Sequence, residues 1–389
     1  RVVKNIFLAS LPAAIALALS ACAHREPQSS LPPIDADALA GRIETLASDA
    51  FEGRAPASPG GRAASTWLAE EMARIGLEPA GENGSYFQTV PLVRSALDVE
   101  DSFFAVTGQT GAETTLAYGP EVMFWTTRGE REVAIEDSEF VFVGYGAVAP
   151  EYSWDDYAGL DVEGKTVVML VNDPGFATKD PDLFTGHAMT YYGRWTYKYE
   201  EAGRQGADAA IIVHETEPAS YGWDVVESSW KGDQFDLVRP DGGANRVGVE
   251  GWVTRDIAER LFDDAGLDFE ELKAAAQEPG FRPVPMPGLS ASARVVSDIE
   301  EMRSRNVIGR LPGAERPDEH VVMTAHWDHL GVRPSDETDD AIYNGAVDNA
   351  AGVSMVLGVA ESLAARDEPL ERSVMVLAVT AEESGLLGA

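Results

Sequence analysis

The alternation of HVVMTAH (residues 320–326), DNAAGVSMVLGVAESLAAR (348–366) and RSVMVLAVTAEE (372–383) decides the fold of this chain. The first and third segments are short, continuous apolar runs that predict buried strands, and the middle segment has apolar side chains at helical spacing. Buried strands that alternate with helices are typical of a mainly parallel sheet covered by helices on both faces. We therefore predict an α/β fold, to which NVIGRLPG (306–313) adds a short strand and a turn.

Polar side chains follow each of these elements. His326 and Asp328 come after the first strand, Asp348 lies at the start of the helix, and Glu382 and Glu383 follow the second strand. Ligands of such sheets bind beyond the carboxyl ends of the strands, and imidazole and carboxylate are ligands of catalytic zinc. A lone His-x-Asp or Glu-Glu pair is more often a hydrogen-bonded or solvated pair, so it is the joint order that predicts a zinc site.

The residue types also suggest separate roles. A carboxylate at Asp328 can be placed to accept the second ring N–H of His326 and hold its tautomer. Neighbouring side chains at a strand end point in different directions, so one glutamate can bind metal while the other handles a proton. The helix dipole favours the ionised form of Asp348, as a metal ligand requires.

The runs TAHWDHLG (324–331), GAVDNAAGVSMVLGVAESLA (345–364) and RSVMVLAVTAEESGLLGA (372–389) resemble the co-catalytic two-zinc aminopeptidases. Relatives of that family include bacterial leucyl aminopeptidases, glutamate carboxypeptidases, glutaminyl cyclases and the transferrin receptor. LASDAFEGRAPASPGGRAASTWLAEEMARIGLEP (46–79) is similar to the start of that peptidase domain. The short β-rich pieces of residues 137–290 resemble an inserted protease-associated domain.

The resemblance implies two zinc ions. It makes His326 a terminal ligand of one zinc and Glu383 a ligand of the other, with Asp348 bridging both metals. The peptide bond between Asp348 and Asn349 is cis in the family. The family also needs an aspartate after the next strand and a histidine nearer the C-terminus, both expected beyond residue 389. We therefore expect the sequence to be C-terminally truncated, and the fragment to hold metal poorly and to have little activity.

The same resemblance gives Glu382 the role of general base toward a metal-bound water, and Asp328 that of orienting His326. The implied activity is that of an exopeptidase that removes N-terminal residues from peptides. His329 matches no invariant ligand and is expected to be structural or to line the cleft. We do not expect His187, His214 or His320 to bind metal.

Two alternatives stay open. One is a carboxypeptidase or glutaminyl cyclase on the same scaffold, although His326 together with Glu383 favours two metals over a single-zinc cyclase. The other is a non-catalytic binding protein like the transferrin receptor. The ligand types at His326, Asp348, Glu382 and Glu383 argue against that second reading, because a degenerate relative should have lost some of them.

The N-terminus is typical of an export signal. Arg1 and Lys4 precede an apolar run from Ile6 to Leu19, which is short for a bilayer span. Leu19-Ser20-Ala21-Cys22 resembles a bacterial lipobox, and Cys22 is the only cysteine of the sequence. We expect lipidation at Cys22, with a membrane anchor and a place in the bacterial periplasm or cell envelope. An ordinary signal peptide is the alternative.

The net charge and the changes in composition along the chain give the remaining predictions. The formal net charge of -35 opposes binding to nucleic acid. We expect a lipoprotein-type signal peptide (1–22), a tether (23–33), the N-terminal part of the peptidase domain (34–136), a β-rich insert (137–290) and the zinc peptidase core (291–389). No pattern in the sequence indicates the oligomeric state or the substrate side chain that is preferred.

Overall fold

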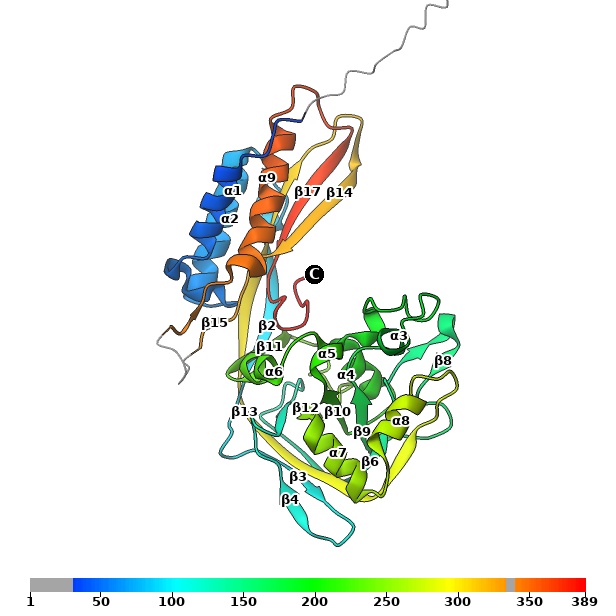
Figure 1. Ribbon diagram of the computed structural model, residues 1–389. Coiled ribbons are helices and arrows are strands. Elements are labelled where there is room, and N and C mark those ends of the chain that lie inside the picture. Colours follow the sequence, from blue (N-terminus) through cyan, green and yellow to red (C-terminus); the bar gives the residue numbers. More distant parts are fainter. Residues whose placement is uncertain (1–30, 334–339) are drawn as a thin grey trace, which may run out of the picture.

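The computed structural model describes residues 31–333 and 340–389. Two lobes are joined by the long strands β2 (Phe87–Leu97) and β13 (Val284–Leu311) (Figure 1). The expected signal segment with Cys22, and residues 23–30 of the expected tether, lie outside the described residues. Within the described ranges, no helix has the length and apolar character of a membrane span.

The first lobe carries the alternation that opens the sequence analysis. Helices α1, α2 and α9 lie together on one side of β14 and β17 (Figure 1). The elements of this lobe besides β2 and the end of β13 are α1 (Ala36–Leu46), η1 (Asp49–Arg54), α2 (Pro59–Ile75), β1 (Glu78–Pro79), η2 (Glu82–Gly84), β14 (Arg316–His326), β15 (Gly331–Val332), β16 (Ile342–Tyr343), η5 (Ala346–Ala351), α9 (Gly352–Ala364) and β17 (Arg372–Val379).

Helix α2 follows from local signals. The hydroxyl of Ser58 caps its N-terminus by accepting the Gly61 N–H, and Pro59 occupies the first turn. Gly76 ends it in the left-handed conformation at φ 95°, which glycine adopts without a Cβ clash. The buried side of α2 packs against α9 and the sheet, in a core that includes Leu68, Met72 and Val376.

Strands β14 and β17 are parallel, and β17 also pairs antiparallel with β13. β17 is largely buried, as its continuous apolar run predicts. β14 differs from the prediction of a buried strand, since Val321 and Val322 are each about half exposed. The reason is its position: within the described residues β14 pairs only with β17 and so forms an edge.

The second lobe is the insert, and it contains helices as well as strands. Its elements are β3 (Phe103–Thr107), β4 (Glu113–Thr115), β5 (Val122–Trp125), β6 (Glu132–Phe142), β7 (Val148–Ala149), η3 (Pro150–Tyr152), β8 (Trp154–Asp155), β9 (Thr166–Leu170), α3 (Pro174–Thr178), η4 (Tyr191–Gly193), α4 (Trp195–Arg204), β10 (Ala209–His214), α5 (Thr216–Ala219), α6 (Trp223–Trp230), β11 (Asp233–Leu237), β12 (Val249–Thr254), α7 (Arg255–Asp264) and α8 (Phe269–Ala275).

The central strands of the insert are buried on both faces. Alternate residues of a strand point to opposite sides, so Val168 packs in the core that contains Phe262 of α7, while Val167 packs with Tyr199 of α4. This explains why β9 and β10 are buried at every position. Strand β11 leaves the insert and pairs with β2, which ties the two lobes together.

The mixed α/β class with a large sheet flanked by helices is confirmed, with two corrections. In the described part of that sheet the parallel pairs are β6–β9, β9–β10, β10–β12 and β14–β17, and the others are antiparallel, so the sheet is not mainly parallel. Helices cover both faces in the insert, whereas α1, α2 and α9 lie on one face of β14 and β17 (Figure 1).

Segments that precede the expected boundary at residue 137 also pack with the insert. Phe104, Val122 and Phe124 belong to the same hydrophobic core as the later strands, because β5 pairs with β12 and β3 pairs with β13. Both pairings join segments more than a hundred residues apart, which no local pattern reveals.

Candidate metal centre and active site

The register of β14 and β17 brings the polar clusters together. His326, the last residue of β14, is paired with Val379, the last residue of β17. Both strands run in the same direction, so the segments that follow them leave the sheet at the same edge. Helix α9 packs on both strands. The segment η5 that precedes it carries Asp348, whose backbone is not helical. Three segments of the chain therefore converge there.

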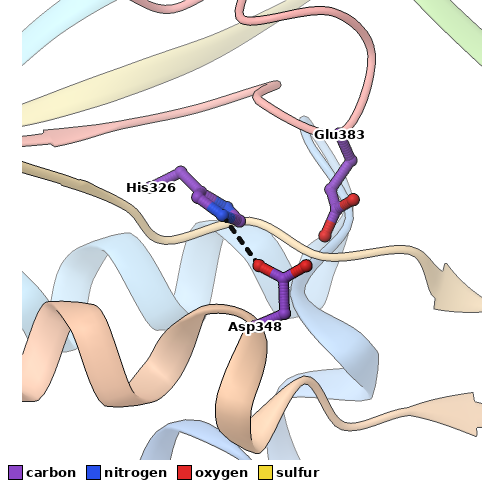
Figure 2. Close-up of side chains that lie close together, drawn as sticks. All are labelled: His326, Asp348 and Glu383. Atoms are coloured by element: carbon purple, nitrogen blue, oxygen red, sulfur yellow. Dashed lines mark ion pairs between the residues drawn. The ribbon is translucent and has the colours of Figure 1, made fainter. Parts of the chain in front are cut away.

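His326, Asp348 and Glu383 form a group that suits a metal ion. One donor atom from each residue lies within 4.8 Å of the other two, and Nε2 of His326 is 2.9 Å from Oδ1 of Asp348. Figure 2 shows the three side chains turned toward one another from the end of β14, the start of the α9 segment and the loop after β17. One imidazole and two carboxylates are a donor set that zinc accepts, so the residues fit the expected metal.

Glu382 lies near the same nitrogen of His326. Its Oε2 is 3.6 Å from Nε2 of His326. Partial burial raises the pKa of the Glu382 carboxyl, and the neighbouring carboxylates of Glu383 and Asp348 raise it further. A carboxylate with a raised pKa is a stronger base at neutral pH, as proton abstraction requires.

Asp328 has a different partner from the one expected. The nearest acceptor to Nδ1 of His326 is the Asp328 backbone carbonyl, at 3.2 Å, whereas the carboxylate oxygen is 3.8 Å away and beyond hydrogen-bond range. The carboxylate instead accepts the backbone N–H of Glu382 at 3.2 Å. Asp328 is fully buried, and burial raises the pKa of its carboxyl to about 7. It holds the Glu382 backbone in place and contacts His326 through its main chain.

The other histidines have different surroundings. Nδ1 of His329 contacts Oε1 of Glu383, and His329 lines a cavity between the lobes. His214 bonds to the Tyr221 carbonyl inside the insert, and His187 packs on Phe176. His320 lies near the start of β14, at the far end of that strand from His326. The peptide bond between Asp348 and Asn349 is cis, which confirms the expectation for that bond.

A cavity of about 970 Å³ opens beside this group. Its lining includes Glu383 and His329 from the first lobe and Asp224, Lys231 and Asp233 from the insert. Its size is that of a ligand cleft, and its walls come from both lobes. The insert therefore contributes to whatever binds beside the candidate metal ligands.

Residues 306–389 match the model of peptidase family M28. All five candidate residues discussed above, from His326 to Glu383, lie in this M28 segment. The match supports a hydrolase that acts on peptides. It covers the first lobe from the end of β13 onward and leaves the insert outside.

The chain is also similar to individual known proteins. A protein of Leptosphaeria maculans described as "Probable zinc metalloprotease" is 39% identical over 89 residues, which are 23% of this chain and 20% of that protein. An aminopeptidase structure from Aneurinibacillus sp. strain AM-1 matches 91% of this chain and 65% of its own, at 17% identity and TM-score 0.46. A Bacillus subtilis zinc aminopeptidase structure matches 92% and 64%, at 17% identity and TM-score 0.40. The chain thus spans a fifth of the curated relative and about two thirds of these structures.

Sequence reasoning missed two residues outside the predicted ligand set. Arg54 is buried beneath the M28 segment, and Gly345 forms the turn before Asp348. Arg54 stands in a Gly/Pro-rich loop nearly three hundred residues before the ligands. The only local signal was an arginine between small residues, which is ordinary in a surface loop.

Proposed function

We propose that this chain is a zinc-dependent aminopeptidase that removes N-terminal residues from peptides. The observation that carries the proposal is the convergence of His326, Asp348 and Glu383 within 4.8 Å at the edge of the sheet where the strands end. The M28 segment contains all three residues and supports the same conclusion.

The side chains divide the work. His326, Asp348 and Glu383 would hold the metal, with Asp348 shared between two zinc ions. Bound zinc supplies Lewis acidity that polarises the scissile carbonyl and lowers the pKa of water. Glu382 takes a proton from the attacking water and returns it to the leaving amine, a role that suits a carboxyl whose pKa is raised by burial. Asp328 keeps Glu382 in position through the Glu382 N–H.

The substrate end is tested with matched peptides. We expect the whole protein to hydrolyse an aminoacyl p-nitroanilide, to lose that activity after dialysis against a chelator, and to recover it when zinc is added. A peptide with a blocked N-terminus and a free C-terminus serves as the comparison. Cleavage of the blocked peptide alone would show that the protein is a carboxypeptidase instead of an aminopeptidase. Activity that survives chelation would contradict the proposed dependence on zinc.

We further propose export and lipid anchoring through Cys22, with the protease-associated insert and the peptidase core facing the periplasm or cell envelope. The support is the signal-like order of residues 1–22. Expression in a Gram-negative host, followed by fractionation, tests this. The wild type is expected in the membrane fraction and should carry a labelled lipid. The Cys22→Ser variant should carry no lipid. An unprocessed wild type in the cytosol would contradict export.

A further inference from the structure

The inference concerns Arg54, the buried arginine beneath the candidate centre. Only 1% of its surface is exposed, although it lies in a loop. Its guanidinium donates to four backbone carbonyls: from Nε to Trp327 at 2.9 Å, from Nη1 to Leu46 at 2.5 Å and Asn344 at 2.6 Å, and from Nη2 to Gly345 at 3.0 Å. One side chain thus joins three segments that are far apart in sequence.

Two of these segments carry the candidate metal ligands. Trp327 stands directly after His326, and Gly345 stands three residues before Asp348. The main chain of Arg54 adds a further link, because its carbonyl accepts the His329 N–H at 3.3 Å. Because one guanidinium bonds to both ligand segments, it fixes the distance between them.

The backbone that presents Arg54 is unusual. Glu52, Gly53 and Arg54 all have positive φ, at 50°, 65° and 54°. A Cβ on Gly53 would meet the Gly331 carbonyl oxygen at 2.4 Å and that of Tyr343 at 2.7 Å, so this turn packs closely against the pair β15 and β16. Non-glycine residues keep such conformations only where the surroundings impose them, often at functional sites.

The charge of Arg54 also faces the centre. The hydrogen-bond partners given above are carbonyls, and the carboxylates of Asp328, Glu383 and Asp348 lie close enough to raise its pKa, although burial lowers that pKa more. A guanidinium stays protonated even so, because its ordinary pKa is above 12. It supplies a fixed positive charge below a group of carboxylates that repel one another.

We propose that Arg54 is the positioning residue of this centre, which sets the distance between the segments carrying His326 and Asp348 and so determines metal affinity. The proposal goes beyond the proposed function and rests on it only for the identity of the metal. The planar guanidinium has five N–H donors in a fixed fork, whereas a lysine ammonium is a single point with three. Lysine keeps the charge but cannot reach all four carbonyls.

The first test measures zinc affinity. The 389-residue chain is titrated with zinc against a chromophoric chelator, at a temperature where circular dichroism shows each variant folded. We expect Arg54→Lys and Arg54→Met to bind zinc about 10 to 100-fold more weakly, the usual effect of losing a group that orients metal ligands. Arg42→Met is the matched control, because Arg42 is also buried but pairs with Glu71 and Glu361 instead of the ligand segments. Its zinc affinity should stay at the wild-type value.

A second variant approaches the same contact from the other side. A Cβ on Gly345, whose φ is 56°, would meet the Asp348 carbonyl at 2.4 Å and Nη2 of Arg54 at 2.6 Å. Gly345→Ala should therefore weaken zinc binding as the Arg54 variants do. It also provides the test if the Arg54 variants fail to fold.

Hydrogen exchange without metal separates this proposal from the proposed function. Arg54→Lys should speed amide exchange in residues 326–331 and 344–350 more than Arg42→Met does. If the wild type binds no zinc but exchange rises in these two segments, the positioning role stands and the zinc peptidase proposal falls. Wild-type exchange in Arg54→Lys, or wild-type zinc affinity in that variant, would overturn the positioning role.

Discussion

At the scale of single residues, Glu382 and Glu383 are neighbours with different surroundings. The Glu383 carboxylate contacts His329 and belongs to the candidate metal group, whereas the Glu382 carboxylate lies 3.6 Å from Nε2 of His326 outside that group. Their backbone directions explain this, since consecutive side chains after a strand turn to different sides.

This difference predicts opposite effects of two isosteric changes. Glu382→Gln should lower kcat by about 10²-fold or more while zinc affinity changes little, because a base is lost but no ligand. Glu383→Gln should instead weaken zinc binding, because a candidate ligand is lost. Steady-state kinetics and zinc titration on both variants decide between the roles. Equal loss of zinc by both variants would show that Glu382 is also a ligand.

Lys198 is a buried amine in α4 of the insert. Its side chain is fully buried in the insert, with Nζ donating to the Tyr145 carbonyl at 2.5 Å. Burial lowers the pKa of Lys198 from 10.5 to about 7, although Asp156 and Asp173 oppose the change. The folded protein therefore holds fewer protons than the unfolded chain between about pH 7 and 10.5.

Stability should consequently rise with pH in that window. Comparison with Lys198→Met isolates the contribution of this residue. Burial raises the pKa of Asp156 to about 7, so the comparison is made from pH 8 to 10, where Asp156 is already ionised. In that range the unfolding free energy of the wild type should increase relative to that of the variant. The gain is at most about 1.4 kcal/mol per pH unit. Urea unfolding at several pH values measures it. A constant difference would mean that Lys198 keeps its proton in the folded state.

At the scale of elements, the start of α2 depends on two glycines. A Cβ on Gly60 would lie 1.9 Å from the Phe51 carbonyl oxygen, and one on Gly61 would lie 2.2 Å from that of Ala55 and 3.2 Å from the Trp327 ring. The missing side chains let the first turn of α2 pack directly under η1, the turn that presents Arg54. Helix α2 and η1 are thus held in close backbone contact.

Gly60→Ala should therefore lower the unfolding free energy by about 1–3 kcal/mol, as overpacking does. Gly41→Ala is the control, because Gly41 is inside α1 with no atom within 4 Å of an added Cβ. That change should raise stability by up to about 1 kcal/mol through helix propensity. Urea unfolding compares the two. A neutral Gly60→Ala would mean that η1 can move away from α2.

At the scale of the whole molecule, the candidate ligands come from three separate segments, so metal binding should stabilise the fold. At a free zinc concentration 100 times the Kd, mass action adds about 2.7 kcal/mol to the unfolding free energy. Asp348→Asn should abolish this gain and leave the metal-free stability near that of the wild type, since the Asp348 side chain is 62% exposed. Urea unfolding with zinc and with chelator measures both. Equal gains in both proteins would place the metal elsewhere.

Much of the fold was readable because the signals were local. The apolar runs of residues 320–326 and 372–383 predicted β14 and β17, and the helical spacing of apolar side chains in residues 348–366 predicted α9. The packing of Phe104 and Phe124 with the insert was not readable from the sequence, because their burial depends on pairing with distant strands. The half-exposed Val321 and Val322 were misjudged for a related reason, since a sequence does not reveal which strand forms an edge.

The sequence by itself determined which residue types stand at the ends of β14 and β17 and at the start of α9, and it predicted their convergence because parallel strands end at one edge of a sheet. Only the tertiary structure decided how they are held. The Asp328 carboxylate bonds to the Glu382 N–H instead of His326, and Arg54 reaches carbonyls at Trp327 and Gly345. Periodicity and spacing act over a few residues, whereas these contacts depend on how remote segments pack, and that geometry exists only once the chain has folded.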